Sequence, residues 1–150
     1  MINNKNGFTL MELMVVVLIV AILAAIGLPQ YFKVIEKQRG TEALGILAAI
    51  NKAQERFFLI NDRFTEDFTD LDLDFVELDT NPPAPPTGAV FNTRAFIFTL
   101  NGTDDDSGVV TAERRDNSYT LERRYETGVV CCTGEEDLCD LFPAVQMCEG

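Results

Sequence analysis

The feature that most constrains this chain is an apolar run near its beginning that contains a single charged side chain. Between Phe8 and Leu28 the only charged residue is Glu12. At about 1.5 Å per residue, a helix of this length spans the roughly 30 Å hydrocarbon core of a bilayer. A carboxylate in such a helix costs about 2.5–3.5 kcal/mol on insertion, so it indicates a function beyond anchoring. The run predicts a membrane-spanning helix in which Glu12 has a specific role.

The residues that open this run resemble a known processing site. The segment Gly7-Phe8-Thr9-Leu10-Met11-Glu12 is similar to the cleavage motif of type IV prepilins and of the related pseudopilins of secretion systems. The resemblance implies that prepilin peptidase, a membrane aspartyl protease, cuts between Gly7 and Phe8 and methylates the new amino group of Phe8. It also implies that Glu12 controls assembly and register between subunits.

Two residues at the far end of the run extend the resemblance. Gly27 and Pro29 lie where pilins place a glycine and a proline at the end of the apolar segment. Proline inside a helix removes one hydrogen bond and clashes with the preceding turn. The sequence therefore predicts a helix break at Gly27 and Pro29, seen as a bend or as local melting just before residue 29.

Two simpler interpretations of the same run explain less of it. A secretory signal peptide with a cleavage region at Ala24-Ala25-Ile26-Gly27 has an apolar core of about 7–15 residues, shorter than this one. Such a discarded segment also gives Glu12 no purpose, and its basic region here would be Lys5 alone. An ordinary single-pass anchor accounts for the length and apolarity, but not for Gly7 or Glu12.

The composition limits the partners of the chain. Its 150 residues include 24 acidic and 12 basic residues, for a formal net charge of −12. Nucleic-acid binding needs clustered Lys and Arg, so no specific nucleic acid is predicted. The pairs Arg114-Arg115 and Arg123-Arg124 are interpreted as solvated or ion-paired strand residues. The chain has no histidine, which removes the commonest general base and metal ligand, and we expect neither an enzyme nor a cofactor.

The cysteines are gathered at the end of the chain, at positions 131, 132, 139 and 148. An even number of cysteines in an exported chain favours disulfides, and the spacing lacks the C-x2-4-C pairs of structural zinc. Because successive side chains on an extended segment point to opposite faces, Cys131 and Cys132 each reach forward. A nested set (Cys131–Cys148 with Cys132–Cys139) and a crossed set remain open, and the nested set is preferred. It would bury Phe142, Val145 and Met147.

Residue pattern and resemblance together predict an α+β pilin fold, in which a long amino-terminal helix packs on a small antiparallel β-meander and a disulfide-closed segment ends the chain. The expected segments are a leader (1–7), an apolar transmembrane and filament-core helix (8–30), the amphipathic half of that helix (31–60) and a globular head (61–150). The head is divided into a connecting loop (61–92), a sheet (93–126) and a cysteine-containing segment (127–150).

The head has recognisable internal signals. Apolar residues recur at helical spacing from Ala43 to Ile60, a stripe that the head should cover, and Asn61-Asp62 ends the helix. Alternation predicts three strands joined as a meander, with a hairpin loop between the first two. The expected strands are Arg94–Leu100, Val109–Arg115 and Ser118–Tyr125, and the expected loop is Asn101–Gly108.

Three further segments have weaker signals. The alternating run Asp70–Phe75 could form a short edge strand, and the proline-rich stretch Asn81–Gly88 predicts an exposed, extended loop. Asp104 to Asp106 could ligate Ca²⁺, although a solvated turn is the preferred interpretation and no metal site is predicted.

The resemblance implies a structural subunit of a type IV pilus. Such a chain enters the inner membrane as a precursor, is cut and methylated, and is assembled by the inner-membrane pilus machinery with other copies of itself into an extracellular filament at the cell surface. Glu12 would pair with the terminal amine of a neighbouring subunit, a register device more than a source of net stability. The alternative is a pseudopilin of a type II secretion system. Motility, adhesion, DNA uptake and secretion are not distinguished by these residues.

Overall fold

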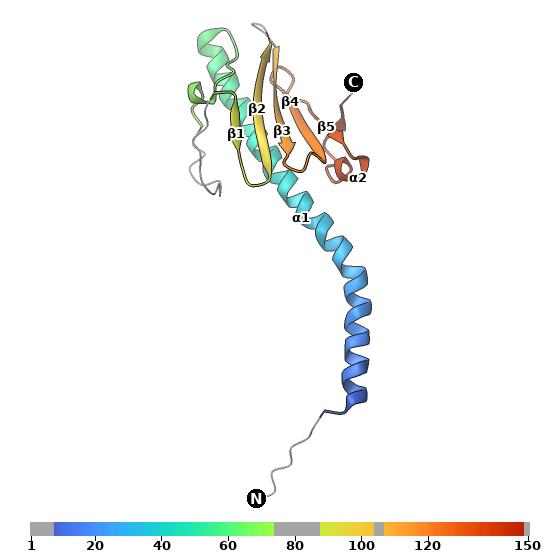
Figure 1. Ribbon diagram of the computed structural model, residues 1–150. Coiled ribbons are helices and arrows are strands. Elements are labelled where there is room, and N and C mark those ends of the chain that lie inside the picture. The colour runs from blue at the N-terminus through green and yellow to red at the C-terminus, as the bar shows by residue number, and fades with distance from the viewer. Residues whose placement is uncertain (1–7, 74–87, 104–106, 149–150) are drawn as a thin grey trace, which may run out of the picture. The chain divides into compact units, whose positions relative to one another are not determined.

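A computed structural model describes residues 8–73, 88–103 and 107–148 of the chain (Figure 1). The chain divides into two compact units, Met1–Glu36 and Lys37–Gly150, which are considered separately below. The long helix α1 (Leu10–Asn61) contributes its first part to the first unit and its remainder to the second.

In the first unit, α1 is helical through Gly27 and Pro29 without interruption. The local melting that the sequence allowed before residue 29 is therefore absent. Proline's fixed φ of about −65° is itself helical, so the ring costs one hydrogen bond without forcing the backbone out of the helix.

In the second unit, the sheet covers the predicted apolar stripe of α1. Ala43, Leu47, Ile50 and Ala53 are all buried, as expected from their spacing. Ile60 was expected in the same stripe but is 81% exposed. The chain turns back at Asp62, which has a positive φ of 53°, and the returning segment packs on Phe58 instead of on Ile60.

Within the described residues, six strands form one sheet in sequence order. They are β1 (Val90–Asn92), β2 (Phe96–Thr103), β3 (Ser107–Arg114), β4 (Tyr119–Arg124), β5 (Val130–Gly134) and β6 (Gln146–Met147). Neighbouring strands are antiparallel from β1 to β5, and β6 runs parallel to β5. Two short helical elements complete the head, η1 (Phe68–Asp70) and α2 (Glu136–Cys139).

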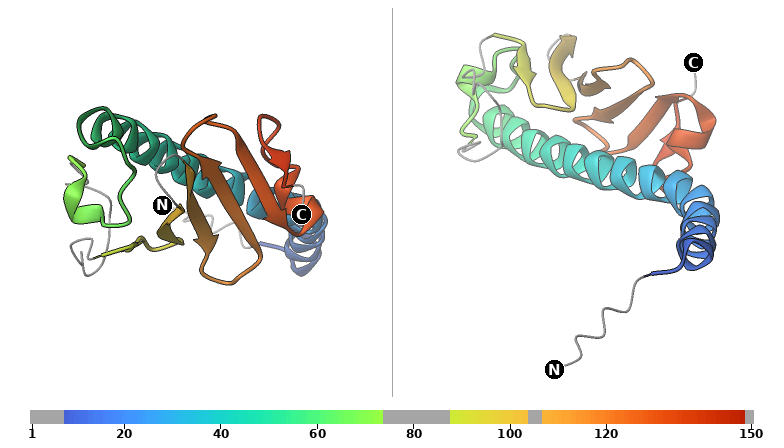
Figure 2. Two further views of the ribbon diagram at one scale, coloured as in Figure 1. Left: turned by 90° about the horizontal axis from the view of Figure 1, so that it is seen from above. Right: turned by 60° about the horizontal axis from the view of Figure 1, so that its bottom comes forward.

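The three predicted strands correspond to the central strands β2, β3 and β4. Phe98, Ala112 and Leu121 lie opposite one another across these strands and are fully buried. The core at these strands also includes buried Phe96, Leu100, Tyr119 and Tyr125. The predicted α+β architecture is confirmed, with a long helix on a mainly antiparallel sheet (Figure 2).

The edges of the sheet differ from the prediction. β1 lies in the segment assigned to a connecting loop, and β5 and β6 lie in the segment assigned to the cysteine-containing end. These strands have three, five and two residues, too short to show an alternating pattern on their own. The expected loop at 101–108 is shorter than predicted, because the ladder between β2 and β3 continues through the pair Gly102 and Gly108.

The run at Asp70 is not an edge strand where the structure describes it. Asp70 ends η1, and Leu71 to Leu73 are not paired with the sheet. The hydroxyl of Thr65 donates a 2.7 Å hydrogen bond to the carboxylate of Asp70, which favours a turn over an extended strand. The described residues do not include Asp74 and Phe75, positions 81–87 of the proline-rich stretch, or Asp104 to Asp106.

Candidate functional site

The amino-terminal site is built on the first turn of α1. The backbone N–H of Glu12 donates a 3.2 Å hydrogen bond to Oγ1 of Thr9, and that hydroxyl lies 3.5 Å from Oε2 of Glu12. This is the arrangement of a helix cap, in which a side-chain oxygen satisfies a backbone donor three residues later. Thr9 thus holds the Glu12 carboxylate near the start of the helix. Gly7 lies outside the described residues.

The helix that carries Glu12 exposes its apolar side chains within its own unit. Among them, Leu10 is 76% exposed and Leu23 is 65% exposed. One helix of the described residues, α1, is long and apolar enough to cross a membrane, with a mean hydropathy of 2.8 over its best window. An apolar surface of this size needs lipid or protein around it, because exposed patches on monomeric soluble proteins rarely exceed a few hundred Å².

The carboxy-terminal segment is closed by two disulfides. Cys131 pairs with Cys148 and Cys132 pairs with Cys139, which is the nested arrangement. Of the three residues expected to be buried by this closure, Phe142 is buried and Val145 is half-buried, but Met147 is 50% exposed. Met147 lies on β6, the outermost strand of the described sheet, where no further strand covers it.

Phe142 connects this closed segment to α1. Its ring lies against the backbone of Gly40, in the space that a β-carbon at that position would occupy. The ring of Phe142 also packs near the ring of Tyr119, with 5.8 Å between the two centroids. The helix, the sheet and the disulfide-closed segment therefore share one core.

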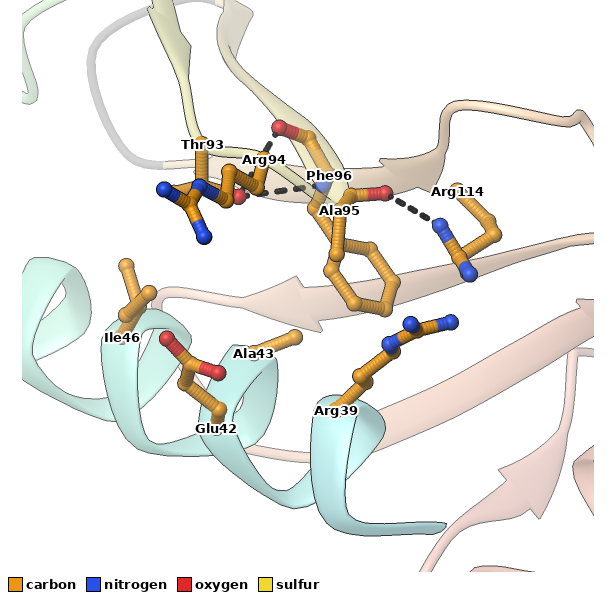
Figure 3. Close-up of a pocket in the computed structure, with 9 residues that line it drawn as sticks. All are labelled: Arg39, Glu42, Ala43, Ile46, Thr93, Arg94, Ala95, Phe96 and Arg114. Atoms are coloured by element: carbon orange, nitrogen blue, oxygen red, sulfur yellow. Dashed lines mark hydrogen bonds between the residues drawn. The ribbon is translucent and has the colours of Figure 1, made fainter. Parts of the chain in front are cut away.

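A cavity of about 430 Å³ lies between α1 and the turn that joins β1 to β2 (Figure 3). Its nine lining residues include three arginines and one glutamate; they are Arg39, Glu42, Ala43, Ile46, Thr93, Arg94, Ala95, Phe96 and Arg114. Figure 3 shows Arg39 and Glu42 on the helix side, with Arg94 and Arg114 on the sheet side.

Arg114 was interpreted from the sequence as a solvated or ion-paired strand residue. It is 9% exposed, and its Nη2 lies 3.9 Å from Oδ2 of Asp116, so it is buried and ion-paired and not solvated. Its Nη1 donates a 3.0 Å hydrogen bond to the carbonyl of Ala95, and its guanidinium lies 5.6 Å from the ring centroid of Phe96. The nearby carboxyl of Asp116 has a lowered pKa, mainly because the hydroxyl of Ser118 donates a hydrogen bond to it.

Gln54 is a structural residue that the sequence analysis did not single out. It is fully buried, donates a 2.7 Å hydrogen bond to the carbonyl of Thr65, and accepts a 3.1 Å bond from the N–H of the same residue. The signal that could have revealed it is a polar residue beside Ala53 and Ile50 on the buried stripe.

Over the part of the chain that the structure describes, no group of three or more His, Cys, Asp or Glu side chains is placed to hold a metal ion.

Tyr125 is buried, which raises the pKa of its hydroxyl, and its ring packs against that of Phe64. The arrangement as a whole offers an apolar helix with one oriented carboxylate and a closed, stapled head.

Comparison with known proteins bears directly on the amino-terminal site. The family model described as the prokaryotic N-terminal methylation motif matches residues 2–28, the segment that contains Gly7, Phe8 and Glu12. The chain is 45% identical over 65 residues to the type IV major pilin protein PilA of Myxococcus xanthus. That match covers 43% of this chain and 30% of PilA.

Two further relatives match over longer stretches. The type IV major pilin protein PilE1 of Neisseria gonorrhoeae is 29% identical over 127 residues, covering 84% of this chain and 67% of PilE1. The type II secretion system core protein G of Escherichia coli is 29% identical over 98 residues, covering 65% of each chain. No solved structure gives a significant match.

These relatives are pilins and a secretion-system core protein, and none of the three is named as an enzyme. The match to PilA is closer but shorter, at 45% identity over 65 residues, than the matches at 29% identity to PilE1 and core protein G. Residues 2–28 carry the prokaryotic N-terminal methylation motif, and the long apolar helix, the sheet and the two disulfides make the chain similar to type IV pilins.

Proposed function

We propose that the chain is a structural subunit of a type IV pilus. Prepilin peptidase cuts it between Gly7 and Phe8 and methylates the amino group of Phe8 while the chain is anchored in the inner membrane. The mature subunit then leaves the bilayer and joins other copies of itself in an extracellular filament. Support comes from the motif match over residues 2–28 and from the relatives named as major pilins.

The observation that carries the proposal is the Glu12 carboxylate, oriented by Thr9 near the start of an apolar run, residues 8–28, that holds no other charge. A lone carboxylate in hydrocarbon is costly, and so is an unpaired terminal ammonium. Each becomes tolerable when it is paired with the other across two subunits. Such a pair fixes the axial position of one helix against the next, which is the best-attested use of a buried ion pair.

The rest of α1 provides the assembly surface. Its apolar side chains are exposed within their unit and would exchange lipid contacts for contacts with the same helix of other copies. Helix association in that setting depends on close van der Waals packing, which the small residues Ala21, Ala24, Ala25 and Gly27 favour. The acidic heads would then face solvent.

A pseudopilin of a type II secretion system is the second candidate. The match to core protein G, which covers 65% of that chain, is the observation that favours it. The disulfide-closed end of the chain favours the pilin instead. If surface filaments are sheared from cells and this chain is their main protein, a pilus is favoured. If cells make no such filaments and deletion of this chain causes a secretion defect, a pseudopilus is favoured.

The role of Glu12 is tested by Glu12→Val. This variant should be processed normally and retained in the membrane but assemble poorly, because removing one member of a buried ion pair typically costs about 3–5 kcal/mol. The matched control is Glu12→Asp, which keeps the carboxylate and should assemble better than Glu12→Val. The measurement is the ratio of sheared filament to membrane pool, and a normal ratio for Glu12→Val would show that the pairing is wrong.

A further inference from the structure

The arginine-lined cavity of the head is unusual for such an acidic protein. Three of the chain's 12 basic residues, Arg39, Arg94 and Arg114, line one cavity of about 430 Å³. They come from three separate parts of the fold: α1, the turn between β1 and β2, and the end of β3. Glu42 is the one carboxylate among the lining residues.

The chemistry of the cavity suits a carboxylate. Arg39 and Arg94 are exposed, while Arg114 is buried, bonded to the carbonyl of Ala95 and 3.9 Å from the carboxylate of Asp116. A guanidinium has five N–H donors in a planar fork, so it can hold its present partners and still bind a carboxylate. The floor contains Phe96, and an apolar floor lowers the local dielectric constant and strengthens charge pairing.

A matching group of carboxylates lies on the other half of the sheet. Glu135, Glu136, Asp137 and Asp140 are all exposed. Glu136 and Asp137 lie within α2, and Glu135 and Asp140 flank it, at the loop that the disulfide between Cys132 and Cys139 closes. We call residues 135–140 the acidic turn. The closed turn presents its carboxylates with less conformational freedom than an open loop would, so less entropy is lost when they bind.

We propose that the arginine cavity is a docking site for the acidic turn of a second copy of this chain. The proposal rests on the assembly proposed above and gives that assembly a contact between heads. Two copies of a chain with twice as many acidic as basic residues repel unless opposite charges meet locally. The arginine cavity facing the acidic turn supplies that local match, and electrostatic complementarity of this kind fixes partner and register.

The placement of the two patches determines the symmetry of the contact. The cavity lies by β1 to β3, whereas the acidic turn follows β5 in the sheet order β1-β2-β3-β4-β5-β6. A contact between two different patches is heterologous, so each copy offers one patch to the copy before it and the other to the copy after it. Such contacts continue into rings or helical filaments instead of stopping at a dimer.

Zero-length crosslinking tests the contact. The variant Arg94→Lys keeps the charge and introduces an amine that a carbodiimide can couple to a touching carboxylate. Filaments of this full-length variant should give a covalent dimer in which position 94 is joined to the acidic turn, identified by mass spectrometry of the crosslinked peptide. Detergent-solubilised monomers should not give it. Arg39→Lys, on the helix side of the same cavity, provides a second probe.

The outcomes separate this inference from the proposed function. If position 94 couples only to Glu42 of its own chain, or to carboxylates of a second copy outside the acidic turn, the docking site is wrong although filaments exist. If the wild-type chain forms no filaments, the proposed function itself fails.

Charge reversal provides an independent measurement. Arg94→Glu should lower filament yield about tenfold or more, because like charges placed opposite one another cost several kcal/mol. Lys52→Glu, the same charge change at an exposed position of α1 outside the cavity, should leave the yield near that of the wild type. Equal yields from the two variants would overturn the inference.

Discussion

At the scale of single residues, two buried contacts join α1 to the rest of the head. Phe142 fills the space beside Gly40, and Gln54 holds both backbone groups of Thr65. Neither contact involves a conventional apolar pair. The first contact needs glycine at position 40, because glycine has no β-carbon. The second needs a side-chain amide at position 54, because an amide both donates and accepts hydrogen bonds. Substitutions at these positions should therefore be costly.

Gly40→Ala should destabilise the head by about 1–3 kcal/mol, because the added methyl group collides with the ring of Phe142 and the core must shift. The control is Gly45→Ala, at a helical glycine whose β-carbon would meet nothing within 4 Å. This control should stabilise the helix by about 0.5–1 kcal/mol, since alanine has the higher helix propensity. Urea unfolding of the full chain in detergent measures both, and equal effects would contradict the packing described here.

Gln54→Leu should also destabilise the head, by about 1–3 kcal/mol, because it leaves the buried N–H and carbonyl of Thr65 without their partner. Asn61→Ala is the control, since the amide of Asn61 is exposed where it bonds to the carbonyl of Phe57, and the expected change is within about 0.5 kcal/mol. The same unfolding measurement compares them. If Gln54→Leu leaves the free energy of unfolding unchanged, the backbone groups of Thr65 do not need the side chain of Gln54.

At the scale of elements, periodicity explains why some parts were predictable. The stripe from Ala43 to Ala53 and the alternating strands β2 and β4 are long enough for the period of buried positions to appear in the sequence. β1 and β6 have three and two residues, and they exist because a neighbouring strand is available to pair with them. Strands as short as these have too few residues to show an alternating pattern.

The same distinction applies to the candidate site. The amino-terminal motif is contiguous, so Phe8 and Glu12 could be singled out from the sequence alone. The arginine cavity is assembled from positions 39, 94 and 114, which only the fold brings together. The sequence left Arg114 as either solvated or ion-paired, because its burial depends on Phe96 and Ala95 from the adjacent strand and turn.

The two disulfides should stabilise the carboxy-terminal end of the head. Replacing Cys132 and Cys139 together by serine should lower the free energy of unfolding by about 2–4 kcal/mol, mainly because the unfolded chain regains freedom. Peptide mapping without reduction checks the pairing itself and should recover the linked peptides Cys131–Cys148 and Cys132–Cys139. Four free thiols, crossed pairs or a bound metal ion in the purified protein would contradict it.

At the scale of the whole molecule, the chain combines two surfaces with different requirements. The first unit exposes an apolar helix that needs lipid or protein around it, and the second has its own core beneath a charged surface. A filament satisfies both requirements, since helices can replace lipid around one another while acidic heads remain in water. The head contact between the arginine cavity and the acidic turn would add register to that assembly.

The central claim is that the precursor is cut after Gly7 and assembled as a filament subunit. Its most direct test is mass spectrometry of filaments sheared from cells, which reports the identity, the amino terminus and the modification of the subunit together. We expect this chain as the main component, beginning at Phe8 and carrying one methyl group on its amino nitrogen. Filaments that lack the chain, or a subunit that retains residues 1–7 or begins elsewhere, would contradict the account.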